Sequence, residues 1–91
     1  MRVRDYIRVW HPETPRESVM RVIAEVADEH FVTPDSLLGR ERFPEVVRAR
    51  FHAWHRIRAE FGHSLPHIGQ VFGRDHSTIL HGIRRWRELN G

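Results

Sequence analysis

Apolar residues recur at helical spacing along most of the chain. The clearest stripe follows Thr14, with charged residues on the other faces; it consists of Val19, Val22, Ile23, Val26 and Ala27. Thr14, Pro15 and Glu17 form a capping-box pattern with proline at the first helical position. The pattern predicts an amphipathic helix that begins at Pro15.

Two further helices are predicted before residue 62. Thr33-Pro34 repeats the cap-and-proline pattern and begins one short helical turn, which Gly39 closes. Phe43-Pro44 begins a long helix that ends at Phe61, before Gly62. Its expected buried face consists of Val47, Phe51, Trp54, Ile57 and Phe61. Its expected exposed arginines are Arg48, Arg50, Arg56 and Arg58.

The last third of the chain carries two helical patterns across a three-residue break. The first contains Leu65, Ile68, Val71 and Phe72, and the second contains Ile79, Leu80, Ile83 and Trp86. Ser64 suits an N-cap, Gly73 suits a left-handed helix end, and Asp75 suits the cap of the second helix. The break predicts a helix-turn-helix within a compact all-α domain of four to five helices, residues 14–91.

Residues 1–13 leave their structure open. Val3, Tyr6, Ile7 and Trp10 fit a short helix ended by Pro12, but they also suit an extended arm. These side chains would serve either as a patch packed on the domain, which we favour, or as a contact for a protein partner.

The charge of the chain is unevenly distributed. All fifteen cationic side chains are arginine, whose planar fork suits phosphate and guanine. Residues 1–39 hold five Arg and seven acidic residues, whereas residues 40–91 hold ten Arg and five acidic residues. We therefore expect a polyanion to meet the C-terminal half.

Composition also limits location and covalent chemistry. The chain has no cysteine, which excludes disulfides and thiolate catalysis and fits a cytoplasmic protein. Charges interrupt the N-terminal ten residues, so they form neither a signal peptide nor a membrane span. We expect a cytoplasmic, nucleoid-associated protein without membrane contact.

The run FGRDHSTILH, residues 72–81, resembles a known signature. In the C-terminal DNA-binding domain of the bacterial replication initiator DnaA, a G-R-D-H-[ST]-T-x-x-H run opens the recognition helix. LLGRERFPEVVRAR and SLPHIG resemble the rest of that domain in order and spacing, so the likeness covers roughly residues 15–89. The resemblance implies an all-α, Trp-repressor-like fold that binds double-stranded DNA at initiator-box-like sites.

The resemblance also implies roles for individual residues. The major-groove and adjacent phosphate contacts fall on Arg74, Asp75, His76, Ser77 and Thr78. Arg50 matches an arginine that enters the minor groove, with Arg48 before it. A phosphate contact falls on the helix start at Ser64 and Leu65, where free N–H groups attract anions. Their position on the same helix, apart from the resemblance, makes His81 a candidate for a structural or phosphate-contacting role and Arg84 a candidate for phosphate contact or for an ordinary charged surface.

The chemistry of the same residues is compatible with these roles. A carboxylate accepts from the amino group of cytosine or adenine, and imidazole packs on a thymine methyl or bonds a base. From spacing alone, a capping role for Asp75 and a solvated His76 fit equally well.

Three departures from the family pattern affect the expected base contacts. Gly73 stands where most initiators have two glycines, so the turn is one residue shorter. The family's R-P-R-Q run appears as Arg48-Ala49-Arg50-Phe51, and Ser77 replaces the commoner threonine. The preferred sites are therefore expected to differ from the family's A·T-rich box.

Catalysis, cofactors and metal are not expected. There is no Walker-type run to hold a nucleotide, and Ser77 and His76, as neighbours on a helix, do not face each other. The closely spaced histidine pairs, His52 with His55 and His63 with His67, lack further ligands at suitable spacing.

Three interpretations follow. We favour a stand-alone DNA-binding protein without ATPase activity, which regulates replication initiation or transcription by occupying sites and meets the replication initiator indirectly through them. A protein-interaction module that uses residues 1–13 and retains the helix-turn-helix as scaffold is the alternative. An excised initiator fragment is the third, and the oligomeric state stays open.

Overall fold

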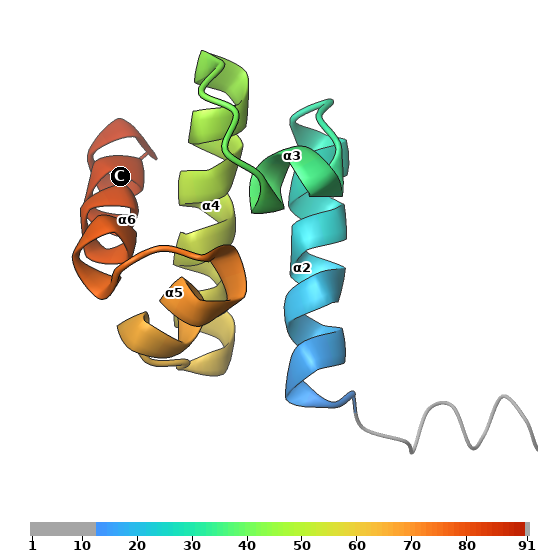
Figure 1. The fold of residues 1–91 in the computed structure, drawn as a ribbon, viewed down its shortest axis with the longest axis vertical. Helices are drawn as coiled ribbons and strands as arrows, with labels where there is room; N and C mark the ends of the chain where they lie inside the picture. The colour runs from blue at the N-terminus through green and yellow to red at the C-terminus, as the bar shows by residue number, and fades with distance from the viewer. Residues whose placement is uncertain (1–12, 91) are drawn as a thin grey trace, which may run out of the picture.

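The computed structural model describes residues 13–90, and this part of the chain is built from helices without strands (Figure 1). The helices are α2 (Pro15–Glu29), α3 (Pro34–Leu38), α4 (Pro44–Phe61), α5 (Leu65–Phe72) and α6 (His76–Asn90). The predicted all-α fold is confirmed. None of the helices in this range has the length and apolarity needed to cross a membrane. The predictions for residues 1–12 lie outside the described residues.

Local capping rules determine where the helices begin and end. The Thr14 hydroxyl accepts a hydrogen bond from Glu17 N–H, and the Glu17 carboxylate accepts one from Thr14 N–H, which confirms the capping box. Ser64 likewise accepts from His67 N–H. Gly62 and Gly73 end α4 and α5 with left-handed φ values of 68° and 67°. Both helix ends were predicted, and the left-handed turn was predicted for Gly73.

Helix α4 is the centre of the domain, with α2 on one side and α6 on the other (Figure 1). Trp54 of α4 is 1% exposed and meets Phe72 of α5 edge to face, with ring centroids 5.8 Å apart. Helix α6 approaches closely because Gly82 has no side chain. A Cβ atom there would lie 2.5 Å from the Trp54 ring.

The buried face of α4 differs from the predicted one. Trp54 and Ile57 are buried as expected, but Val47, Phe51 and Phe61 are only partly buried. The core side of the helix instead consists of Val46, Ala49, Arg50, Ala53, Trp54 and Ile57. The two alanines allow neighbouring helices to pack closely, so the face is centred on small residues that a search for large apolar side chains passes over.

Candidate nucleic-acid interface

The turn between α5 and α6 presents residues 74–78, which the sequence predicts to contact DNA and which we call the reading run. Gly73 turns the chain, and Arg74 N–H then donates to Gly69 O at 2.8 Å. Asp75 Oδ1 accepts a hydrogen bond from Ser77 N–H at 3.2 Å, so the predicted cap of α6 is confirmed. Helix α6 begins at His76, and its first three residues are exposed, as is Asp75. The first turn of α6 is therefore accessible to a ligand.

Asp75 and His76 form a paired donor and acceptor at this helix start. His76 Nδ1 lies 3.1 Å from Asp75 Oδ1, and the two side chains are 62% and 65% exposed. An exposed pair of this kind contributes little to stability, so both groups are available to exchange partners with a base edge. Capping by Asp75 is compatible with such contacts because the second carboxylate oxygen is not needed for the cap.

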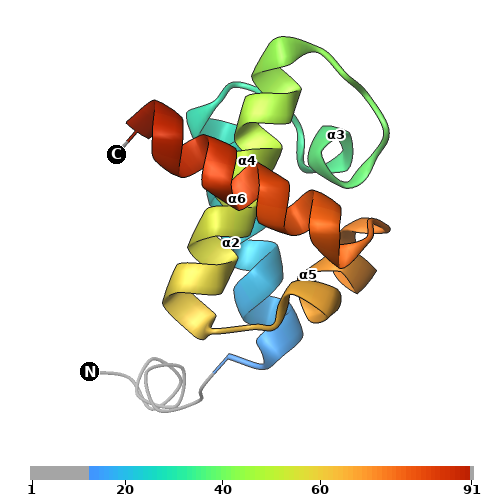
Figure 2. The ribbon, with the colours of Figure 1, turned by 90° about the vertical axis from the view of Figure 1, so that its left-hand side faces the viewer.

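Hydrogen bonds from two arginines connect the α3–α4 loop, residues 39–43, to the turn of the helix-turn-helix. Arg40 Nη2 donates to Gly73 O at 3.0 Å. A second hydrogen bond joins the same two segments in the opposite direction, because Arg74 Nη2 donates to Gly39 O at 2.7 Å. Arg74 Nη1 donates to Phe72 O at 2.7 Å. Figure 2 shows this loop on the same side of the domain as the start of α6. The reciprocal bonds hold two segments more than 30 residues apart at one surface.

Arg50 is not the exposed helix arginine that the sequence predicted, and in this structure its guanidinium is not free to insert into a minor groove. The residue is 4% exposed. Its Nε donates to Leu37 O at 3.0 Å, and its Nη2 donates to Ser36 O at 2.8 Å and to Gly39 O at 3.1 Å. These carbonyls belong to the end of α3, where no further helical turn satisfies them. The guanidinium therefore serves as an internal cap for α3.

A hollow of about 570 Å³ lies between the α3–α4 loop, α4 and the start of α6. Its lining consists of Arg40, Arg42, Val47, Arg50, Phe51, Trp54, Arg74, Thr78 and His81. Burial and the neighbouring Arg50, Arg40 and Arg42 lower the pKa of Arg74 to about 10. Burial is also the main reason why the pKa of Arg50 is lowered. Four cations in one hollow repel one another, so the site is suited to bind an anion.

Arg40 and Arg42 are functional candidates that the sequence analysis did not single out. Both are exposed, and both line the hollow beside the reading run. The available signal was an R-x-R run directly after a helix-closing glycine, in the half of the chain that is rich in arginine.

The remaining predicted residues occupy three positions. His81 is exposed, lines the hollow and lies edge to face with Phe51, with ring centroids 6.3 Å apart. Arg48 and Arg84 are exposed on α4 and α6. Ser64 and Leu65 lie at the far end of α5, about 12 Å along its axis from the turn. The structure therefore does not bring Ser64 and Leu65 to the hollow.

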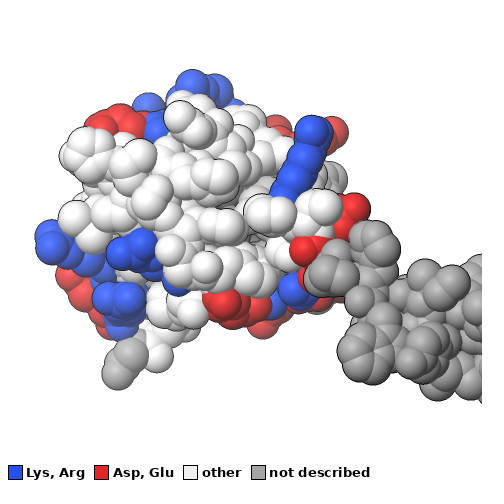
Figure 3. Space-filling model, turned by 90° about the horizontal axis from the view of Figure 1, so that it is seen from below, with Lys and Arg blue, Asp and Glu red and all other residues white. Residues whose placement is uncertain are grey.

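A second hollow is less suited to a polyanion. It lies between the start of α2 and α5 and is lined by Thr14, Pro15, Arg16, Val19, Met20, Leu38, His67 and Val71. Arg16 is its one permanently charged lining residue. Figure 3 views the end of the domain where α2 begins and shows a broad uncharged surface with arginines toward its margins.

The chain is similar in sequence to bacterial chromosomal replication initiator proteins. The chromosomal replication initiator protein DnaA of Deinococcus radiodurans is 40% identical over 83 residues, which cover 91% of this chain and 18% of that protein. The DnaA protein of Deinococcus deserti is 42% identical over 83 residues, with the same coverage. No solved structure gave a significant match. The chain thus spans less than a fifth of the length of these relatives.

The similarity extends further toward the N-terminus than the sequence motifs indicated. A match to the DnaA protein of a Bradyrhizobium strain, 37% identical, covers 98% of this chain and 18% of that protein, so it includes most of residues 1–13. The family model described as the bacterial DnaA protein helix-turn-helix matches residues 19–85, which hold the whole of α5, the turn and the start of α6. On this match and on the geometry of the turn, the chain belongs to the bacterial DnaA family of DNA-binding helix-turn-helix domains.

Proposed function

We propose that this domain binds double-stranded DNA in a sequence-specific manner, at sites resembling initiator boxes. The start of α6 would enter the major groove, where Asp75, His76 and Thr78 would meet base edges or the adjacent phosphate. The observation that carries the proposal is the pair of bonds between Arg40 and Gly73 and between Arg74 and Gly39. They hold the α3–α4 loop, with the exposed Arg40 and Arg42, beside the exposed start of α6.

Arg42 is the residue we propose for the minor groove, in place of Arg50. It is exposed on a loop that flanks the start of α6, whereas Arg50 is buried and Arg40 already bonds Gly73. A narrow A·T minor groove attracts such an arginine through its negative potential.

In the biological context, we propose that the domain acts in replication initiation or in transcription by occupying its sites. It would meet the replication initiator through shared DNA sites, and its DNA binding would place it on the nucleoid. The support for this context is the family match and the printed name of the relatives, chromosomal replication initiator proteins.

The first test compares Arg42→Ala with Arg87→Ala in fluorescence-anisotropy titrations of a box duplex and a shuffled duplex. We expect Arg42→Ala to weaken binding to the box by about 1 kcal/mol and to reduce the salt slope by about one. Arg87 is an exposed arginine in the last turn of α6, about 16 Å along the axis from His76, so its loss should have little effect. Equal losses in the two variants would show that only overall charge matters.

The unmodified domain also tests the function as a whole. Preference for the box, with affinity falling as salt rises, is the expected result. Salt-dependent binding without preference would contradict sequence specificity. An absence of binding would contradict the proposed function.

A second test concerns discrimination by His76. His76→Ala should reduce the preference for the box over the shuffled duplex by about 1 kcal/mol, because a base contact is lost while the arginines remain. His67→Ala, which removes an exposed histidine on α5, is the matched control. A uniform loss of affinity for both duplexes would instead assign His76 to a phosphate.

A further inference from the structure

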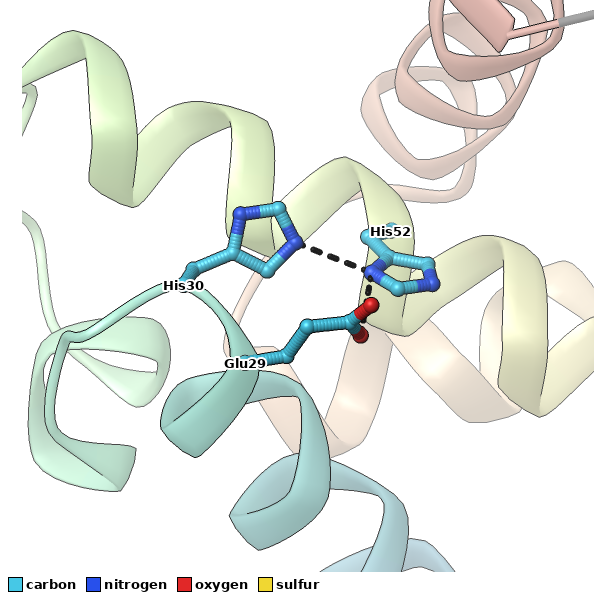
Figure 4. Close-up of side chains that lie close together, drawn as sticks. All are labelled: Glu29, His30 and His52. Carbon is cyan, nitrogen blue, oxygen red and sulfur yellow. Dashed lines mark hydrogen bonds and ion pairs between the residues drawn. The ribbon is translucent and has the colours of Figure 1, made fainter.

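Three metal-ligating side chains converge where α2 ends against the middle of α4. Glu29 is the last residue of α2, His30 follows it, and His52 lies on α4 (Figure 4). His30 Nε2 lies 2.9 Å from His52 Nδ1, and Glu29 Oε2 lies 3.6 Å from the same nitrogen. The potential ligand atoms of the three residues all lie within 4.8 Å of one another.

The spacing of these atoms fits a tetrahedral metal ion. With metal–ligand bonds of about 2.0–2.1 Å, two ligand atoms of a tetrahedral site lie about 3.3 Å apart. The separations of 2.9 and 3.6 Å fall on either side of that value. The third separation, between the His30 and Glu29 ligand atoms, is within 4.8 Å, so rotation of the exposed Glu29 side chain would bring its oxygen to an ion held between the two imidazoles.

The donor chemistry is that of a borderline transition metal. Two imidazoles and one carboxylate form a ligand set typical of Zn²⁺ sites with one open position. The exposed Glu29 leaves a fourth position accessible to water.

Neighbouring aromatic contacts fix the two rings before an ion arrives. Trp86 of α6 stacks on His52, with centroids 4.3 Å apart and an interplanar angle of 8°. The same indole meets the His30 ring edge to face at 6.1 Å. Rings held in this way lose little side-chain freedom on binding.

We propose that Glu29, His30 and His52 bind one Zn²⁺ ion per chain, at a site apart from the DNA-reading surface. The ion would replace the hydrogen bond between the two imidazoles and link the end of α2 to α4. It would do so beside Trp86 of α6, which stacks on His52. Because the ligands converge only in the folded chain, Zn²⁺ should raise the melting temperature.

The test titrates ZnCl₂ into the tag-free chain by calorimetry after chelator treatment, with Co²⁺ absorption as a readout of coordination geometry. We expect one saturable site, a four-coordinate Co²⁺ spectrum, and affinity at least about tenfold weaker in His52→Gln and His30→Gln. The control replaces His63 and His67, a second histidine pair with ring centroids 4.6 Å apart, by glutamine. It should bind Zn²⁺ as the parent does.

Glu29→Gln separates loss of metal binding from loss of folding, because Glu29 is exposed and lies outside the core. Its metal-free melting temperature should match that of the parent, while the rise caused by Zn²⁺ is reduced or lost. The proposal is overturned if the parent shows no saturable site, if the Glu29 and His52 variants bind as the parent does, or if the His63 and His67 control loses the site.

Discussion

Replacing Arg50 with alanine should lower the free energy of unfolding by about 3 kcal/mol. The guanidinium is buried and donates three hydrogen bonds to the carbonyls of Ser36, Leu37 and Gly39. Alanine would leave these carbonyls without their donor and open space beside the core. Because the same bonds position the start of the α3–α4 loop, we also expect weaker DNA binding by the folded protein.

Arg48→Ala is the matched control for Arg50→Ala. Arg48 lies two positions away on the same helix and is exposed, so its loss should change the free energy of unfolding by less than about 0.5 kcal/mol. Arg50→Lys should be nearly as harmful as alanine, since a single ammonium cannot reproduce the planar fork. Urea unfolding followed by circular dichroism measures all three. An unchanged midpoint in Arg50→Ala, with loss of DNA affinity alone, would restore the minor-groove role.

Local rules account for the parts of the fold that the sequence predicts correctly. Capping by Thr14 and Ser64 depends on residues three positions away, and the end of α5 depends on a single left-handed glycine, Gly73. Such contacts are short in sequence, so a pattern of residue types specifies them.

Contacts between distant segments account for the errors. Arg50 resembles an exposed helix arginine until the carbonyls of α3, 11 to 14 residues earlier, are placed beside it. Arg40 was not singled out because its partner, Gly73, is 33 residues away. His30 and His52 are 22 residues apart, so spacing rules for histidine pairs do not connect them. The helices were therefore predictable, whereas the surface that they assemble required their packing.

Gly69→Ala should destabilise the domain by about 2 kcal/mol and weaken DNA binding at least about tenfold. A Cβ atom on Gly69 would lie 2.2 Å from the carbonyl oxygen of Arg74, which is backbone and cannot rotate away. Relieving this overlap costs about 3 kcal/mol, and the better helix propensity of alanine offsets about 1 kcal/mol of that. The relief must move α5 away from the turn and break the bond from Arg74 N–H to Gly69 O.

The effect on DNA follows because this turn sets the direction of α6 relative to the α3–α4 loop. When the turn moves, the bonds from Arg40 to Gly73 and from Arg74 to Gly39 cannot both persist, so the exposed arginines and the reading run lose their relative position. Gln70→Ala changes the adjacent, exposed position of α5 and should alter neither unfolding nor binding. Box binding measured well below the melting temperature separates the two effects. Parental affinity in a destabilised Gly69→Ala variant would show that DNA recognition does not depend on the geometry of this turn.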